Sequence, residues 1–256
     1  GEGGRAARET RYAVRMAIGN ELIERSRELG ELLAREEGKT HAEGIGEVYR
    51  SGQFFHYFAG EVHRQIDDRT DSVRPGIEVD TRREPVGVVA VISPWNFPMA
   101  TAVWKIAPAL AFGNSVVFKP ANLVPASAWA LTEIISRQSA LPAGTFNLVM
   151  GSGSTVGDAI INSDKIHAVS FTGSLPVGRE VAKATAANLV KCQLEMGSKN
   201  ALIVAADADL DVAVNAAFVG AYSGTGQKCT ASSRLIVDEA IHDQFVDKLV
   251  AKLRST

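Results

Sequence analysis

The chain has 256 residues, of which 46% are hydrophobic, enough for a large core in one domain or in one domain plus part of another. The formal net charge of −2 shows no basic excess, so we expect no nucleic-acid partner. No apolar run reaches the length of a membrane span and no signal peptide is recognisable, which predicts no membrane partner and a cytoplasmic location. Since the first residue is not methionine, we expect a piece of a longer chain.

The first 71 residues are expected to be mainly helical. Apolar residues recur at helical spacing over residues 6–37, where Gly19 and Gly30 interrupt or punctuate the pattern. A second helix is predicted over residues 42–62, and the helical spacing of its aromatic residues favours a core role over a binding site. The histidines of this region lack a third ligand at metal spacing, so no metal site is predicted.

Residues 72–84 form a polar, proline-containing stretch that alternates like an exposed ribbon. Two interpretations remain open for it. The stretch is either a simple surface hairpin or a hairpin that pairs with another subunit.

From Pro85 onward, short apolar strands alternate with helical stretches. Continuous runs rich in β-branched residues are typical of strands buried on both faces of a sheet. The predicted strands are 86–93, 115–119, 146–150, 168–171, 189–195 and 200–204. Strand, short loop and helix repeated at this spacing predict an α/β fold, a doubly wound, Rossmann-like parallel sheet preceded by N-terminal helices.

Ligands of such sheets bind at the carboxyl ends of the strands. Lys119 ends the second strand, where it either holds ribose hydroxyls or a phosphate or is simply a solvated lysine. Residues 151–157 read Gly-x-Gly-x-x-x-Gly, which differs from the dinucleotide fingerprint but still offers bare N–H groups at a helix start. Ser174, at the next helix start, could contact the same pyrophosphate.

The two cysteines have contrasting surroundings. Cys229 follows Lys228 on a glycine-rich loop, so a reactive thiolate and an idle loop thiol are both possible. Cys192 lies in a strand-like run and is expected to be a small buried hydrophobe. Such different contexts predict no disulfide between them and indicate a reducing compartment.

Two further side chains are candidates for polar chemistry. Glu195 lies on a bend beside a glycine, where a carboxylate could act as a general base or be an ordinary surface glutamate. Asn96 lies between Trp95 and Phe97, where its amide could stabilise an oxyanion or simply favour a turn.

Five short motifs follow one another along the chain. They are Pro-Trp-Asn-Phe-Pro at 94–98, Phe-Lys-Pro-Ala at 118–121, Phe-Thr-Gly-Ser at 171–174, Leu-Glu-Met-Gly at 194–197 and Gly-Gln-Lys-Cys at 226–229. In this order they resemble the aldehyde dehydrogenase superfamily, over nearly the whole chain from Arg5 onward. The sequence around Glu195 and Lys119 looks like the α-ketoglutarate semialdehyde (2,5-dioxopentanoate) dehydrogenase branch.

The resemblance implies a role for each candidate residue. Cys229 would attack an aldehyde to give a thiohemiacetal and then a thioester, with Asn96 and the backbone N–H of Cys229 holding the oxyanion. Glu195 would activate the water that hydrolyses the thioester, and Lys119 would contact the adenosine ribose. The residues implied to bind the cofactor, NADP or NAD, are Ile92, Ser93, Pro94, Trp95, Lys119, Asn122, Gly153, Gly157, Phe171, Thr172, Gly173, Ser174, Met196 and Gly197.

The chain also departs from the family pattern. Asn122 stands where the family often has an acidic residue, and Ser198 stands where it often has a second glycine. An uncharged Asn122 predicts that NADP is tolerated. A coenzyme A-acylating enzyme is an alternative, although that type lacks the base that Glu195 would supply. A non-catalytic nucleotide-binding homologue is a further alternative, and the presence of Cys229, Glu195 and Asn96 argues against it.

The resemblance also suggests a division of the chain. Residues 1–71 would be the helical part of the cofactor domain, 72–84 a ribbon for oligomerisation, 85–204 the NAD(P)-binding domain and 205–256 the start of the catalytic domain. Family members run to nearly twice this length, so the resemblance implies an aldehyde dehydrogenase fold with an incomplete catalytic domain. We expect this stretch alone to be inactive and the full-length protein to be a homo-oligomer, a dimer or tetramer.

Overall fold

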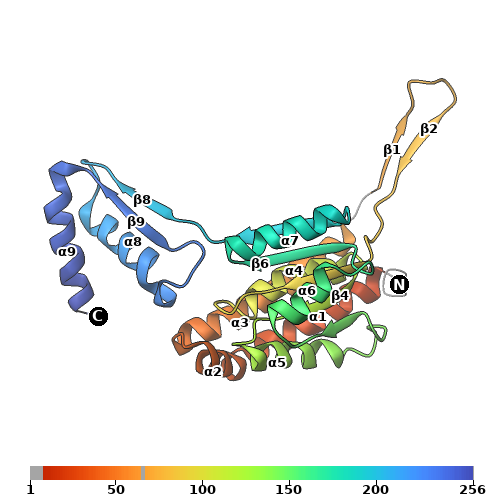
Figure 1. The fold of residues 1–256 in the computed structure, drawn as a ribbon, viewed down its shortest axis with the longest axis horizontal. Helices are drawn as coiled ribbons and strands as arrows, with labels where there is room; N and C mark the ends of the chain where they lie inside the picture. Colours follow the sequence, from red (N-terminus) through yellow and green to blue (C-terminus); the bar gives the residue numbers. More distant parts are fainter. Residues whose placement is uncertain (1–7, 65–66, 256) are drawn as a thin grey trace. The chain divides into compact units, whose positions relative to one another are not determined.

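The computed structural model describes residues 8–64 and 67–255, and the chain divides into two compact units, one ending at Glu195 and one beginning at Met196. The first unit contains the N-terminal helices and the main sheet, and the second contains a small β-α-β arrangement (Figure 1). The start of the first helix, predicted near Ala6, lies outside the described residues.

Three helices open the first unit: α1 (Arg8–Glu24), α2 (Ser26–Glu37) and α3 (His41–His63). The helical stretch predicted over residues 6–37 is confirmed from Arg8 onward, but its break is at Arg25. Gly19 and Gly30 do not interrupt these helices. A Cβ atom at Gly19 would lie 2.8 Å from the carbonyl oxygen of Gly52, and one at Gly30 would lie 2.6 Å from Cα of Ile45. Both glycines allow α3 to approach closely.

The main sheet has five strands in the order β5-β4-β3-β6-β7. The strands are β3 (Val88–Ile92), β4 (Ser115–Lys119), β5 (Phe146–Leu148), β6 (Ala168–Gly173) and β7 (Lys191–Met196). The pairs β3–β4, β3–β6 and β4–β5 are parallel. The chain runs from central β3 outward through β4 and β5 and then crosses to β6. In doubly wound sheets, ligands bind at the carboxyl ends of the strands where the strand order reverses, which here is between β3 and β6.

Helices cover both faces of the sheet, as predicted for a doubly wound fold. On one face, Val91 and Phe118 pack in a core with α4 (Ala100–Ala111), α5 (Pro125–Ser136) and residues of the N-terminal helices. On the other face, Val88 and Val117 line a hollow of about 460 Å³ together with residues of η2 (Gly153–Gly157) and α6 (Asp158–Ile161). Helix α7 (Leu175–Ala187) packs against β6.

The predicted ribbon is an antiparallel hairpin of β1 (Asp68–Asp71) and β2 (Glu78–Thr81). Its first strand begins before residue 72, earlier than predicted, and all residues of both strands are exposed. The surface-hairpin interpretation agrees with this exposure, and pairing with another subunit stays a prediction.

The second unit has its own sheet and core. Strand β8 (Asn200–Val204) pairs in parallel with β9 (Ser232–Val237), and α8 (Leu210–Tyr222) connects them. The remaining elements are η3 (Ser223–Gly226), η4 (Glu239–Ile241) and α9 (His242–Arg254). Phe245 and Leu249 pack against Val204. The strand predicted at 200–204 is thus present, but it belongs to this unit and does not extend the five-stranded sheet.

Candidate active site

The strand register brings three of the predicted cofactor residues together. Ile92, the last residue of β3, is paired with Lys119 on one side and with Phe171 on the other. Three of the strands that the sequence predicted therefore end side by side, with Ser93 continuing from β3 and Thr172 continuing along β6. Polar groups that are far apart in the sequence meet at one edge of the sheet.

Lys119 is a buried lysine, with only 5% of its surface exposed. Its Nζ donates to the carbonyl oxygen of Pro120 at 2.9 Å, and its Cε would lie 3.9 Å from a Cβ atom at Gly157. Burial lowers the pKa of Lys119 below its ordinary value. The side chain therefore runs along the sheet edge to the start of α6, and the alternative of a solvated strand-end lysine is wrong.

Ser93 supplies an unusual hydroxyl at the same edge. It is 4% exposed, and its Oγ has no hydrogen-bond partner among the described residues. Its backbone N–H donates to the carbonyl oxygen of Lys119 at 3.3 Å. A buried hydroxyl without a partner is costly, and a bound polar ligand would satisfy it. Ser93 thus fits the cofactor contact that the resemblance implies.

Two helix starts add backbone N–H groups. Gly153 opens the short π-helical turn η2, in which Ser152 Oγ accepts from Thr155 N at 3.1 Å. Ser174 precedes α7, and within residues 67–255 its side chain makes no capping hydrogen bond. In the first α7 turn, Pro176 has no N–H and the N–H of Gly178 bonds the Ser174 carbonyl, so the N–H groups of Leu175 and Val177 are the ones that could bind an anion.

Gly173 has a steric reason to be glycine. A Cβ atom there would lie 2.5 Å from Cζ of Phe171, so a larger residue would displace the phenyl ring. Phe171 is itself buried at the end of β6. The glycine therefore lets the chain turn closely over the aromatic ring before α7 begins.

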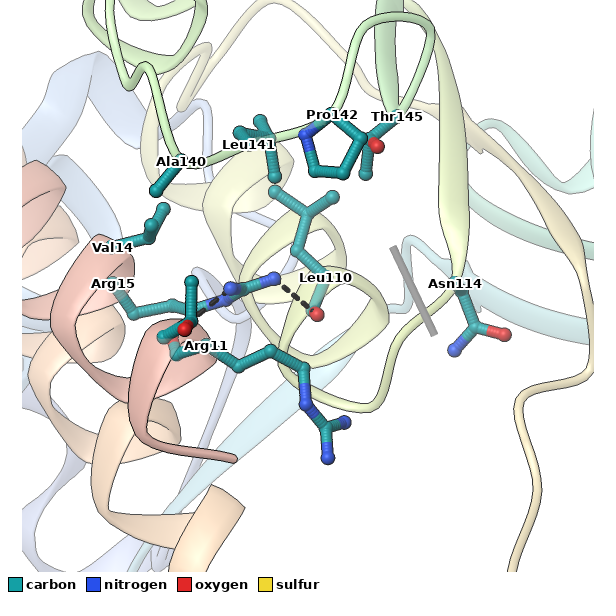
Figure 2. A pocket seen from close by; sticks show the side chains of 10 residues that line it. Arg11, Val14, Arg15, Leu110, Asn114, Ala140, Leu141, Pro142 and Thr145 are labelled. Atoms are coloured by element: carbon teal, nitrogen blue, oxygen red, sulfur yellow. Dashed lines mark hydrogen bonds between the residues drawn. The ribbon is translucent and has the colours of Figure 1, made fainter. Parts of the chain in front are cut away.

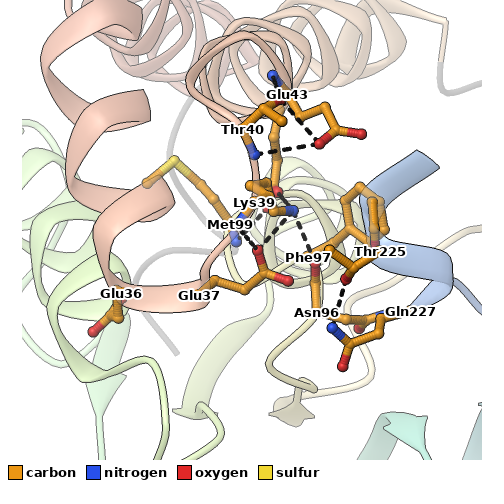
Figure 3. Close-up of polar contacts among 12 residues, drawn as sticks. Glu36, Glu37, Lys39, Thr40, Glu43, Asn96, Phe97, Met99, Thr225 and Gln227 are labelled. Carbon is orange, nitrogen blue, oxygen red and sulfur yellow. Dashed lines mark hydrogen bonds and ion pairs between the residues drawn. The ribbon is translucent and has the colours of Figure 1, made fainter. Parts of the chain in front are cut away.

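Asn96 lies in the turn between β3 and α4, and its backbone is held by residues that were not predicted from the sequence. Its carbonyl oxygen accepts from Lys39 Nζ at 2.9 Å (Figure 3). Lys39 also pairs with Glu47 at 2.7 Å. Trp95 and Pro94 belong to the same turn. Asn122 lies exposed in the turn after β4.

Glu195 lies exposed near the end of β7 and accepts from Gln193 Nε2 at 3.3 Å. Lys105, on α4, is 6% exposed. Burial lowers the pKa of Lys105, and the charge of Glu195 opposes this shift. Lys105 is therefore electrically coupled to the predicted base. Lys105 was not predicted as a site residue, but it could have been noticed in the sequence because it is the single charged residue in α4.

Cys192 corrects one sequence prediction. It lies in β7, at the edge of the sheet, and its side chain is exposed, so it is not a buried hydrophobe. An edge strand has a neighbour on one side only, which leaves its side chains less covered. Both cysteines are free thiols.

Cys229 belongs to the second unit, in the loop between η3 and β9, where it is exposed. Gly224, Thr225 and Gly226 before it all have positive φ angles, of 59°, 56° and 69°. A non-glycine residue in this region is uncommon, so the loop is held in a specific shape. The carbonyl oxygen of Cys229 accepts from Asn200 Nδ2 at 2.7 Å.

Lys228, the predicted neighbouring cation, donates from Nζ to Ser223 Oγ at 2.7 Å. Met196 ends β7, and Gly197 follows it in the connection to β8.

Among the described residues, no three His, Cys, Asp or Glu side chains gather in a way that could hold a metal ion. In the same part of the chain, every helix is too short or too polar to cross a membrane.

The first unit is a doubly wound α/β fold in which buried Lys119 and Ser93 lie at the strand ends, where such sheets bind their ligands. Residues 4–256 match the model of the aldehyde dehydrogenase family, and the chain belongs to this family.

Curated relatives carry related names. The chain is 46% identical to an alpha-ketoglutaric semialdehyde dehydrogenase of Bacillus subtilis (strain 168), over 90% of this chain and 47% of that protein. It is 40% identical to a 2,5-dioxopentanoate dehydrogenase of Saccharolobus solfataricus, over 95% of this chain and 51% of that protein. The chain therefore spans about half the length of the curated relatives it matches.

A solved structure supports the fold. A crystal structure of betaine aldehyde dehydrogenase from Staphylococcus aureus in complex with NAD⁺ has a TM-score of 0.97 and 37% sequence identity. The match covers 99% of this chain and 50% of that chain. The aldehyde dehydrogenase fold predicted from the motifs is thus confirmed.

Proposed function

We propose that this chain is part of an NAD(P)-dependent enzyme that oxidises an aldehyde to a carboxylic acid. The strand-end edge carries the proposal, because it combines buried Lys119, the Ser93 hydroxyl, which has no partner among the described residues, and the start of α7 with its N–H groups of Leu175 and Val177. A lysine suits ribose hydroxyls or a phosphate, and a helix start suits a pyrophosphate. Membership of the aldehyde dehydrogenase family and a relative crystallised with NAD⁺ support it.

In the proposed reaction, Cys229 Sγ attacks the carbonyl carbon of the aldehyde as a thiolate and forms a thiohemiacetal. The amide of Asn96 and the backbone N–H of Cys229 donate to the oxyanion. The nicotinamide ring, when bound, accepts hydride from the same carbon. A thioester then remains on Cys229, and Glu195 takes a proton from the water that hydrolyses it. The carboxylic acid leaves and the thiolate is restored.

We further propose that the substrate is a short oxo-acid with a terminal aldehyde, 2,5-dioxopentanoate being the first candidate. Several of the most similar relatives are named for this compound or for α-ketoglutarate semialdehyde, which is the same molecule. Other relatives are named for betaine aldehyde or succinate semialdehyde, so the three aldehydes form a natural comparison set.

The test uses the full-length enzyme, which is the protein that contains this chain and a further part corresponding to the unmatched half of its relatives. NAD(P)H formation is measured with each of the three aldehydes, and the Cys229→Ala variant serves as the control. We expect the highest kcat/KM with 2,5-dioxopentanoate and no turnover in the variant. Equal kcat/KM values for the three aldehydes would refute the substrate assignment but leave the oxidation intact.

The coenzyme A-acylating alternative is tested in the same assay. An acylating enzyme would need coenzyme A for steady NAD(P)H formation, whereas hydrolysis assisted by Glu195 needs only water. We therefore expect the same steady rate with and without coenzyme A. A non-catalytic homologue would bind the nucleotide and give no NAD(P)H with any aldehyde.

A further inference from the structure

The turn that carries Asn96 is held by a buried ion pair from the N-terminal helices. Lys39 Nζ lies 2.7 Å from Glu47 Oε2, and the two side chains are only 3% and 1% exposed. The same Nζ donates to the carbonyl oxygen of Asn96 at 2.9 Å and lies 4.0 Å from the centre of the Phe97 ring (Figure 3). The ammonium group thus contacts two consecutive residues of the turn.

Glu47 holds the other side of this turn. Its Oε1 accepts from the backbone N–H groups of Met99 at 2.9 Å and of Ala100 at 3.0 Å. Within residues 67–255, Met99 provides no side-chain cap for α4, so the carboxylate of a distant helix replaces one. Burial raises the pKa of Glu47, while Lys39 and the two N–H groups oppose that shift.

Lys39 is itself fixed in position by the short connection between α2 and α3. Gly38 ends α2 in the left-handed conformation with φ of 94°, and Thr40 begins α3 with a reciprocal capping box to Glu43. The N–H of Lys39 also donates to Glu37 Oε2 at 3.0 Å. A lysine placed between two well-formed helix ends has little backbone freedom, which makes it a suitable anchor.

Helix α4 is also held at its far end by the N-terminal helices. Arg15 donates to the carbonyl oxygen of Leu110, and Arg11 Nη1 donates to that of Ala111 at 3.0 Å. Figure 2 shows the bond from Arg15 beside a cavity of about 10 Å³, which is room for about one water molecule. A carboxylate at its start and guanidinium groups at its end match the dipole of α4.

We propose that Lys39 and Glu47 form a positioning pair that fixes the side chain of Asn96 in the active site. The proposal rests on the proposed function, in which the Asn96 amide donates to the oxyanion. The pair holds the backbone at the Asn96 carbonyl and at the N–H groups of Met99 and Ala100, so the turn that follows the Asn96 Cα is fixed at three points. A donor that is fixed before the reaction needs no reorganisation when the negative charge develops.

The test is made in the full-length enzyme with the double variant Lys39→Met/Glu47→Gln. The double change is preferable to a single one because removing one partner alone would leave the buried charge of the other unpaired. Glu37→Gln is added to it, because the Glu37 carboxylate is 4% exposed and lies 3.8 Å from Lys39 Nζ, so it would otherwise lose this cation. The rate constant of the first NAD(P)H burst reports acylation, and a separate titration reports the Kd of the cofactor. We expect the acylation rate to fall about tenfold, less than the roughly 10² to 10³ for loss of an oxyanion donor, and the Kd to stay within about twofold.

Two further variants separate positioning from general stability. Glu36 is a matched control because its carboxylate caps α5, accepting from Ser127 N at 2.9 Å, without touching the turn at Asn96. Glu36→Gln should lower the thermal midpoint but keep the acylation rate at saturating cofactor within about twofold. Lys39→Arg retains a cation and donor, so its acylation rate should exceed that of Lys39→Met.

The decisive measurement is made in the Asn96→Ala background. If Lys39 and Glu47 act through the amide of Asn96, their loss should have almost no further effect once that amide is gone. A tenfold fall that persists in this background, or no fall with Asn96 intact, would overturn the proposal. If Asn96→Ala alone leaves acylation unchanged, the oxyanion role fails first, and the positioning pair fails with it.

Discussion

Cofactor choice is predicted to depend on Asn122, in the turn after Lys119. Replacing it with glutamate would place a negative charge near the 2′-phosphate of NADP, while the same carboxylate could accept hydrogen bonds from the ribose hydroxyls of NAD. Two unit charges 4 Å apart interact by about 1 kcal/mol in water and about 4 kcal/mol at the effective dielectric near a protein surface. Because Asn122 is exposed, the lower part of this range applies.

A loss of about 1 to 2 kcal/mol corresponds to a roughly 5- to 30-fold fall in kcat/KM for NADP. The assay compares kcat/KM for NADP and NAD in the full-length enzyme and in the Asn122→Glu variant, with NAD expected to change little. Leu123→Glu is the matched control, because this neighbouring side chain is 69% exposed and was not assigned to the cofactor. If the NADP/NAD ratio does not move, or moves as much in the control, Asn122 is not the selector.

Four more results are expected. Cys229→Ser should abolish turnover, while Cys192→Ala should keep most of it. Because both thiols are exposed, both could be alkylated, so the turnover of the variants is the measurement that identifies the nucleophile. Glu195→Gln should retain the NAD(P)H burst and slow the following phase by roughly 10² to 10⁴, and loss of the burst would assign Glu195 another role. Burial lowers the pKa of Lys119, whose charge is present below that pKa and lost above it, so NADP affinity should fall at a lower pH than it would with an ordinary lysine. The NADP affinity of a Lys119→Arg variant should depend less on pH. Identical pH profiles for the two enzymes would contradict this role of Lys119. A polypeptide ending at Thr256 should bind cofactor poorly and show no turnover, which intact mass and NAD(P)H formation together would test.

Much of the fold follows from local patterns in the sequence. The apolar run that ends at Lys119 predicts β4 with the bounds that the structure has. Such elements depend on the periodicity of neighbouring residues, which a sequence displays directly. The strand-end rule then places Ile92, Lys119 and Phe171 at one edge before any distance is known, because parallel strands end together.

Other features depend on residues that meet only after the chain has folded. The burial of Lys119, the contact of Lys39 with Asn96 and the capping of α4 by Glu47 join segments that no local pattern relates. The exposure of Cys192 depends on the place of β7 at the sheet edge, and the pairing of β8 with β9 assigns that strand to the second unit. Composition and periodicity determine which elements form, whereas burial and long-range hydrogen bonds are decided by how those elements pack.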